Sequence, residues 1–309
     1  MKIVISFVLA TLCIFGGYML AGGQLRLLMQ PAEYLIIAGG AAAAFYLGTS
    51  SKSVRVIKDV LKKSMRKESQ TDEYVELMAL LHEVLSKMSR EGMIAIEADV
   101  DDPEKSALFQ RFPLASGDTL SMNFITDYLR MMATSKLTGA QLQSAMDDEI
   151  NTRKKENEKA CSAIFKIADA LPAFGIMAAV MGVVHVMGSV GQVSNAELGI
   201  MIGNALVGTF VGVLLAYAYV GPLGQFVENR LGDSVKKLEC IQASLVAHVG
   251  FGFSPALAVE FGRKTLFSGV RPSYWELEQR VRELRTVAAP GTVTGTTPNA
   301  GAAGAFQGR

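Results

Sequence analysis

The sequence predicts an all-α integral membrane protein with four transmembrane helices, a large helical cytoplasmic domain and long helices that extend from the third and fourth spans. Half of the 309 residues are hydrophobic, and they are clustered rather than spread evenly. Residues 168–191 and 197–224 each provide about 20 positions without Lys or Arg, enough for a helix to cross a bilayer core of roughly 30 Å. Residues 50–166 are polar, have helical periodicity and contain no convincing strand.

The first hairpin is predicted within residues 1–49, with spans at about 3–21 and 31–48. The initial apolar run is longer than the usual core of a signal peptide, and no secreted-type domain follows it, so we interpret it as a retained span. A short turn carrying Arg26 separates it from the second span. That span is rich in Gly and Ala, which let helix backbones approach closely in lipid.

The distribution of basic residues predicts the orientation. The segment after the second span is strongly basic, whereas the loop at 189–197 has no Lys or Arg. The basic residues are Lys52, Arg55, Lys58, Lys62, Lys63, Arg66 and Lys67. By the positive-inside rule, the segment after residue 50 and both termini are cytoplasmic, and the tight loops lie outside. Because these residues serve as topology signals, the sequence predicts no nucleic-acid partner.

A cytoplasmic helical domain is predicted at residues 50–166. Asp118 is expected to cap a helix that runs through Met132, and Thr138 lies in a turn that begins another helix. The apolar pattern of this last helix continues through Arg153 toward the membrane without a clear stop signal. A single long helix is therefore predicted to leave the membrane and project into the cytoplasm.

The second hairpin is predicted at 167–224, with spans at about 168–190 and 198–221. A cytoplasmic helical segment at 225–286 keeps helical spacing beyond the fourth span, so a second rod is predicted beside the first. Residues 287–309 form a low-complexity tail that cannot bury a core and is predicted to be disordered.

The sequence contains no motif of an enzyme, a metal site or a cofactor site. It has no Walker loop, no GxSxG elbow, no HExxH and no clustered His, Cys and Asp ligands. Cys13, Cys161 and Cys240 lie far apart without CxxC spacing, so we interpret them as packing residues. We expect no catalytic activity, no metal and no cofactor.

Pro172 and Pro222 are candidates for a hinge pair. Each lies where a span of the second hairpin would meet the same side of the membrane, and a helical pattern continues beyond it. A proline removes one backbone donor and frees the carbonyl four residues earlier, here those of Ala168 and Ala218, so the helix bends. The alternative is that each proline is merely tolerated in a membrane helix.

Three stretches resemble one known family. DALPAFGIMAAVMGVVHVMG, from Asp169, and VGTFVGVLLAYAYVGPL, from Val207, are similar to the third and fourth membrane helices of the MotA family, the ring-forming stator subunits of the bacterial flagellar motor. FGGYMLAGGQLRLLMQPAEYLIIAGG, from Phe15, resembles the first hairpin of that family. The resemblance implies a multi-pass protein of the bacterial cytoplasmic (inner) membrane that couples ion flow to torque on the rotor.

The same resemblance implies a homo-oligomer, a pentameric ring around MotB, a single-span subunit anchored to peptidoglycan. An aspartate of MotB would sit among the third and fourth helices of the ring. Thr209 would face that aspartate together with Ala179. Sodium-driven relatives usually have threonine at the position of Ala179, so the alanine favours protons.

A rotor contact is also implied. Arg90 and Glu97, around Gly92 and Met93, resemble the charged pair through which the family engages the rotor protein FliG. This segment is one residue shorter between the arginine and the glycine than in the best-known members, so Glu97 aligns more securely than Arg90. Lys87 or Glu91 is an alternative for part of that role.

Few ionisable residues lie in the predicted spans, and charges in a membrane are costly enough to make each a functional candidate. We interpret His185 as a hydrogen-bonded structural histidine in the outer half of its span, rather than as a proton relay. Asp169, at the inner edge, is placed at the mouth, where it would help ions to leave. Glu33 is placed at the outer edge. We therefore expect the mid-membrane carboxylate to come from the partner.

Two other functions remain open. An ExbB- or TolQ-like subunit would also transduce energy across the membrane, but those relatives usually have three spans and lack the QPAE hairpin at residues 30–33. A passive scaffold that only organises other membrane proteins is the alternative from a different class.

Overall fold

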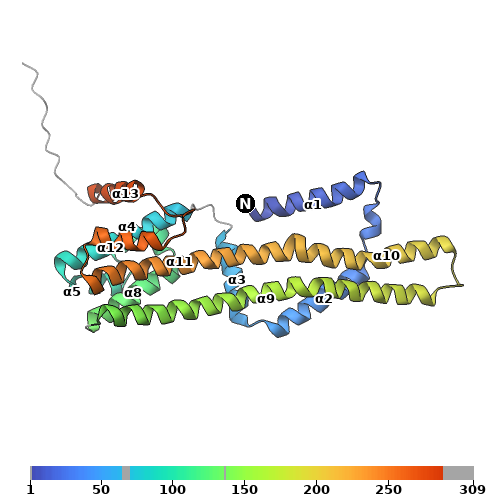
Figure 1. The fold of residues 1–309 in the computed structure, drawn as a ribbon, viewed down its shortest axis with the longest axis horizontal. Helices are drawn as coiled ribbons and strands as arrows, with labels where there is room; N and C mark the ends of the chain where they lie inside the picture. Colours follow the sequence, from blue (N-terminus) through green and yellow to red (C-terminus); the bar gives the residue numbers. More distant parts are fainter. Residues whose placement is uncertain (1, 65–69, 136, 288–309) are drawn as a thin grey trace, which may run out of the picture.

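The computed structural model describes residues 2–64, 70–135 and 137–287, and every regular element in those ranges is a helix (Figure 1). Two antiparallel helices run along the elongated molecule. One is α9 (Gly139–Gly188), and the other joins α10 (Asn195–Leu214), the π-helical segment η2 (Leu215–Val220) and α11 (Gly221–Phe251). These helices confirm the predicted all-α class and the long extensions of the third and fourth spans.

Both long helices begin at a capping box. The Thr138 hydroxyl accepts a hydrogen bond from the Gln141 backbone N–H, and the Gln141 side chain accepts one from the Thr138 N–H. Ser194 and Glu197 make the same reciprocal pair at the start of α10. Each box satisfies two backbone donors that a helix start otherwise leaves unpaired. The predicted helix start at Thr138 is therefore confirmed.

Three helices of the described chain are long and apolar enough to cross a membrane, and the number is four if α2 (Pro31–Gly48) and α3 (Ser51–Ser64) count as one bent span. These two helices meet at an angle of 114°. In Figure 1, α3 lies across the long axis of the molecule instead of continuing α2. The count of four spans remains a prediction.

The first helix, α1 (Lys2–Leu20), packs only lightly on the remainder of the molecule. Its Thr11 hydroxyl lies 2.7 Å from the hydroxyl of Tyr219, and the ring of Phe7 lies 5.2 Å from the Tyr219 ring. A short 3₁₀ turn, η1 (Leu25–Leu28), leads from α1 toward α2. The apolar surface of α1 is thus left for lipid or for another helix.

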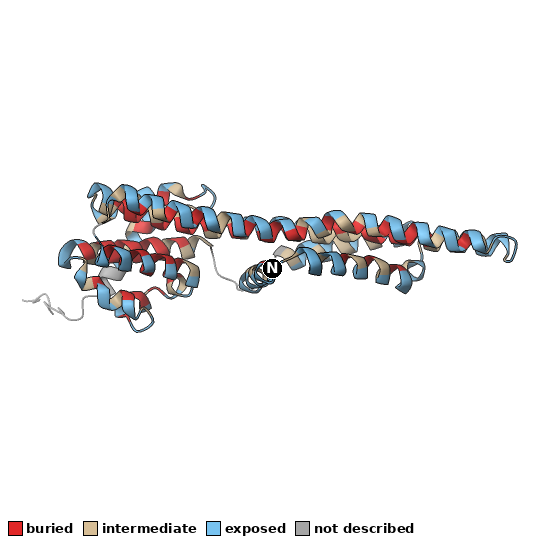
Figure 2. Cartoon of the chain, turned by 90° about the horizontal axis from the view of Figure 1, so that it is seen from below, coloured by how far each residue is buried: buried red, intermediate tan, exposed pale blue. Residues whose placement is uncertain are grey.

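The ends of α9 and α11 farthest from the α9–α10 loop are surrounded by shorter helices, and we call this part of the molecule the head. Its shorter helices are α4 (Gln70–Glu91), α5 (Ile94–Asp101), α6 (Ala107–Gln110), α7 (Pro113–Ser116), α8 (Thr119–Thr134), α12 (Pro255–Thr265) and α13 (Tyr274–Val287). Tyr74, Phe109, Phe112 and Phe124 are fully buried in its core. Figure 2 shows buried positions concentrated in the head and on the facing sides of the long helices.

One predicted helix cap is wrong. α8 begins directly after Asp118, but the Asp118 carboxylate makes no capping bond to the helix backbone. It accepts a hydrogen bond from the Ser121 hydroxyl at 3.0 Å and forms ion pairs with Lys63 and Lys237. The ion pairs take the place of the cap. Residues 288–309, predicted to be a disordered tail, lie outside the described residues.

Candidate functional site

The α9–α10 hairpin is packed through its backbone at glycines. A Cβ atom added to Gly175 would lie 2.7 Å from the Gly208 carbonyl oxygen, and one added to Gly212 would lie 2.6 Å from the Leu171 carbonyl oxygen. Both distances are too short for a real side chain, so any larger residue must push the helices apart. Close approach at small residues is the usual way in which helices associate in lipid.

Thr209 and Ala179, the predicted ion-pathway residues, lie at nearly the same level of this hairpin. A Cβ atom placed on Gly208 would lie 3.0 Å from the Ala178 Cβ, so Thr209 and Ala179 each follow a residue of one contact between the two helices. Ala179 is 8% exposed, and Thr209 is half-buried. The Thr209 hydroxyl makes no hydrogen bond to a described residue, so it is available to a group from another chain.

Pro172 and Pro222 are staggered along the hairpin rather than level with each other. Pro172 lies close to the level of Gly212, whereas Gly224, two residues after Pro222, contacts Phe165. α9 continues through Pro172 as one helix, and Pro222 occupies the second position of α11. The two prolines therefore mark separate points along the helix pair, and their role as hinges remains a prediction.

The π-helical segment η2 lies between these points, and the sequence reasoning missed it. The Gly221 N–H donates to the Ala216 carbonyl oxygen, five residues back instead of four. A Cβ atom on Gly221 would lie 2.9 Å from that oxygen, so the glycine suits the wider turn. The Gly221–Pro222 dipeptide was the available signal. Since η2 packs against α9 around Leu171, an irregular turn faces the Pro172 region, and such turns are frequent at functional sites.

Glu33 lies deeper than the sequence predicted. Its side chain is buried against α9 and α10, with Oε2 3.1 Å from a Cβ atom placed on Gly208, next to Thr209. Oε2 has no hydrogen-bond partner in the described chain. Gly208 lies near the middle of the predicted fourth span, so on those bounds Glu33 places a carboxylate inside the span, where the sequence analysis expected none from this chain. The first turn of α2 gave no sign of this, because the burial comes from other helices.

The other ionisable residues of the hairpin are exposed. Asp169 lies on the head side of Pro172 and faces away from the helix pair. His185 is exposed near the end of α9, and its ring makes no hydrogen bond to a described residue. Its predicted role as a hydrogen-bonded structural histidine therefore finds no support within this chain.

Arg90 and Glu97 are both exposed on the head, at the junction of α4 and α5. Gly92 makes the turn between these helices with φ of +84°, a conformation that favours glycine. Arg90 Nε donates to the Ser86 carbonyl oxygen at 3.3 Å, and among the described residues its charge has no acidic partner. Lys87, an alternative for the rotor contact, instead pairs with Asp99 at 2.7 Å within the head.

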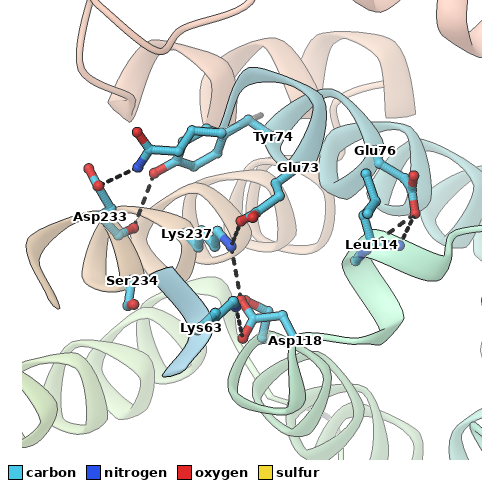
Figure 3. Close-up of polar contacts among 12 residues, drawn as sticks. Lys63, Glu73, Tyr74, Glu76, Leu114, Asp118, Asp233, Ser234 and Lys237 are labelled. Atoms are coloured by element: carbon cyan, nitrogen blue, oxygen red, sulfur yellow. Dashed lines mark hydrogen bonds and ion pairs between the residues drawn. The ribbon is translucent and has the colours of Figure 1, made fainter. Parts of the chain in front are cut away.

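A buried ion-pair cluster joins α11 to the head, and the sequence gave no sign of it (Figure 3). Lys237 Nζ on α11 lies 2.5 Å from Glu73 Oε2 on α4 and 3.1 Å from Asp118 Oδ2 before α8. Lys63 of α3 approaches the other Asp118 oxygen at 3.3 Å. Nearby, the Tyr74 hydroxyl donates to the Asp233 carbonyl oxygen. We call Lys237, Glu73, Asp118 and Lys63 the junction cluster.

The junction cluster is held by opposite charges. Burial raises the pKa of Asp118, but attraction by Lys237 and Lys63 outweighs burial and leaves that pKa below its usual range. Burial likewise lowers the pKa of Lys237, and the charges of Asp118 and Glu73 more than reverse this effect. Both partners are therefore charged at neutral pH, and the cluster ties α11 to three other helices.

The thiols of the chain are unpaired, and Cys161 and Cys240 are buried. Burial raises the pKa of Cys161 to about 11 and that of Cys240 to about 12, so neither thiol is reactive at neutral pH. Cys13 is exposed on α1. Within the described ranges, no group of three or more His, Cys, Asp or Glu side chains is placed to hold a metal ion.

Family models match two parts of the chain. Residues 4–92 match the model described as "Motility protein A N-terminal", and residues 117–240 match the model of the "MotA/TolQ/ExbB proton channel family". Among curated proteins, Motility protein A of Salmonella typhimurium is 38% identical over 286 residues, which cover 92% of this chain and 96% of that protein. Motility protein A of Escherichia coli matches with the same identity and coverage.

A third relative is the chemotaxis protein LafT of Vibrio parahaemolyticus, which is 34% identical over 88% of this chain and 95% of its own length. Two solved structures share the fold. The C. jejuni MotAB structure has a TM-score of 0.70 at 18% identity and covers 88% of this chain and 98% of that one. The flagellar MotAB stator complex of Bacillus subtilis has a TM-score of 0.65 at 18% identity, with coverage of 91% and 98%.

Proposed function

The chain belongs to the MotA family, and from this premise we propose that it is the stator subunit of a bacterial flagellar motor that works with a MotB-like partner. The observation that carries the proposal is the 38% identity to Motility protein A, which extends over nearly the whole of both chains. The match of residues 4–92 to the N-terminal motility model favours a stator over an ExbB- or TolQ-like subunit. This is a family of motor and channel subunits rather than of enzymes.

The proposed assembly is a multi-pass protein of the inner membrane. We place four spans in the membrane, with both termini and the head in the cytoplasm, and five copies in a ring around the partner. Residues of the α9–α10 hairpin line the inside of the ring, because Thr209 offers a hydroxyl that makes no hydrogen bond to the described part of its own chain. An aspartate of the partner is the carboxylate that loads and unloads the ion, and Ala179 favours a proton.

The proposed mechanism couples charge to helix shape. One elementary charge that crosses 100 mV supplies about 2.3 kcal/mol. Binding of the ion to the partner's aspartate changes the contact between that aspartate and the hairpin. The glycine packing between α9 and α10 leaves no space for these helices to move closer together. The adjustment is taken up at Pro172 and η2, the two irregular points of the helix pair. α9 and α11 are continuous into the head, so a change of angle at these points moves the head.

The moving end carries the rotor contact. Arg90 and Glu97 are exposed at the junction of α4 and α5, and Arg90 pairs with no acidic side chain within the ranges that the structure describes. We propose that they face charged groups of FliG. The junction cluster passes motion of α11 to α4, the helix that carries Arg90.

The deciding experiment replaces Pro172 by alanine in a strain that lacks its own stator chain. We expect normal membrane levels and normal copurification with the partner, but no swimming, because the helix loses its irregular point. Pro255→Ala is the matched control, since Pro255 sits in the first turn of a head helix and should be replaceable. Unchanged swimming in Pro172→Ala would instead support a passive scaffold.

Two further measurements separate the remaining alternatives. Reporters fused at Arg26 and Ser194 should both lie outside, and an inward reporter at Arg26 would favour a three-span ExbB- or TolQ-like subunit. Swimming in sodium-free medium tests the proton assignment of Ala179. Swimming by cells that hold this chain without any partner subunit would refute the proposed function.

A further inference from the structure

A pocket opens where the end of α2, the start of α3 and the middle of α9 meet. Its volume is about 450 Å³. Three lysines, Lys155, Lys159 and Lys166, line it together with the hydroxyl groups of Thr49 and Ser162 and with one acid, Glu158. A pocket of this size with converging basic and hydroxyl groups is suited to a small anionic group.

The lysines form a stripe on one face of α9. With Ser162 they follow the spacing i, i+4, i+7 and i+11, which keeps side chains on the same side of a helix over roughly 17 Å. Like charges at this spacing repel and weaken a helix. None of the three lysines has an ion pair with a described residue. By contrast, Lys87 in the head and Lys154 on another side of α9 both have acidic partners.

α3 extends this basic surface across the molecule. Its apolar residues Val56, Ile57, Val60 and Leu61 pack onto a cluster that α9 and α11 form around Ile164 and Leu231. This packing leaves the opposite side of α3 exposed. That side carries Lys52, Arg55, Lys58 and Lys62, which make no ion pair with the described chain, together with one acid, Asp59.

The position of this basic surface relative to the predicted spans favours lipid headgroups as its binding partner. Lys166 lies two residues before the predicted start of the third span, and α3 lies across the long axis that the spans follow (Figure 1). The part of this basic surface formed by Lys166 and α3 therefore lies next to the lipid headgroups. Clusters of four to eight Lys and Arg next to a span attract acidic lipids.

We propose that the pocket between α3 and α9 binds the phosphate-bearing headgroup of an acidic phospholipid. Lys159 and Lys166, which flank Ser162, pair with the phosphate, Lys155 adds positive charge beside them, and the hydroxyls of Thr49 and Ser162 donate to its oxygens. The bound headgroup relieves the repulsion along the stripe and braces α3 against α9. The inference requires only that the chain spans a membrane, so it stands apart from the stator assignment.

The test uses the full chain, purified with its candidate partner and placed in nanodiscs of mixed phosphatidylglycerol and phosphatidylcholine. Lipids that remain bound after transfer to detergent are counted by native mass spectrometry. We expect the wild type to retain phosphatidylglycerol selectively. The triple variant Lys155→Gln, Lys159→Gln and Lys166→Gln should retain it about tenfold less or worse, because each basic residue near an anionic surface contributes several-fold.

Two matched variants make the test specific. Replacement of the same three lysines by arginine keeps the charge and should keep the lipid. Replacement of Lys105, Lys264 and Arg282 by glutamine removes equal charge from exposed sites in the head and should have no effect. Equal retention by the wild type and the Gln triple variant would overturn the proposal.

Two other results would also overturn it. Full displacement of the lipid by millimolar inorganic phosphate would indicate a site for a free anion. Loss of the oligomer in the Gln triple variant, with unchanged lipid retention, would indicate that the lysines contact a neighbouring copy of the chain.

Discussion

The same two helices are held together differently in the hairpin and in the head. Between α9 and α10 the closest contacts are made by glycine backbones, and the absence of side chains at these glycines lets the helices approach closely. In the head, α11 packs in a core with large aromatic side chains and is fixed by the buried Lys237 ion pairs. In lipid, apolar side chains gain no hydrophobic free energy by moving between helices, so the association of helices there depends on close packing. In the head, burial of apolar surface supplies the driving force, and buried charges specify the arrangement.

The largest effect is expected from Lys237→Met, because it leaves Glu73 without a cation and Asp118 with only the partly exposed Lys63. Such losses destabilise a protein by about 3–5 kcal/mol. Cys240 gives the measurement. It is fully buried three residues further along α11, so a maleimide reaches it only when the head opens. Its labelling rate is followed against urea in a chain whose other cysteines are alanine.

The control for that variant is Lys236→Met. Lys236 pairs with Glu239 at 2.5 Å but is partly exposed, so its loss should destabilise the head by about 1 kcal/mol or less. Equal destabilisation of the head by the two substitutions would show that the junction cluster stabilises the head no more than a partly exposed ion pair does. Contact between α9 and α10 should remain unchanged in both.

The next effect is expected from Gly212→Val, which acts on the hairpin alone. Its Cβ would lie 2.6 Å from the Leu171 carbonyl oxygen, and overpacking of this kind costs about 1–3 kcal/mol. We expect a lower melting temperature for the complex with the partner, and loss of swimming, with normal Cys240 labelling. Gly203→Val on the same helix meets no atom within 4 Å and should be tolerated. Damage from both substitutions alike would contradict the close-packing argument.

A smaller effect is expected from acid, and only in the head. The pKa of Asp118 is held below its usual value near 4, so the stabilisation is complete above that pH and is lost as pH falls through the lower native value. The rate at which Cys240 reacts with 4,4′-dithiodipyridine, a thiol reagent that works in acid where maleimides do not, should therefore rise on acidification below about pH 4. Asp118→Asn removes this titration, and its acid response should be weaker than that of the wild type.

The smallest effect is expected at the exposed pair of Arg282 and Glu278 on α13. Their atoms lie 2.6 Å apart, but Arg282 is largely exposed, so Arg282→Gln should change stability by less than about 0.5 kcal/mol. The same urea titration provides the measurement. A larger change in stability would mean that an exposed ion pair with a short N–O distance can stabilise the head without burial.

Local patterns predicted much of this architecture. The apolar runs and the uninterrupted periodicity from Leu142 onward gave α9 as one helix, and Thr138 marked its start, because these signals lie within a few residues of one another. Pro172 and Pro222 gave the hairpin as a candidate site, because a proline changes the helix within one turn of itself. The resemblance of the membrane helices added the family.

Features made by distant contacts could not be predicted in this way. Glu33 is buried only because α9 and α10 pack against it. The Asp118 carboxylate pairs with Lys237 of another helix instead of capping α8. The angle between α2 and α3 depends on packing against α9 and α11. For η2, a local signal existed in Gly221 and Pro222, but a proline alone indicates a bend and does not specify a wider turn.

The wide turn of η2 changes the rotation of α11 about the helix axis relative to α10. An α-helix advances 100° per residue, and a turn that admits one more residue leaves everything beyond it rotated by about that angle. The side of α10 that presents glycine to α9 and the side of α11 that presents Leu238 and Leu245 to the head core thus belong to two different azimuths of one continuous rod. If the surplus residue moved up or down the helix, the residues it passed would turn about the axis without breaking the rod, so bending and twisting are both built into the same six residues.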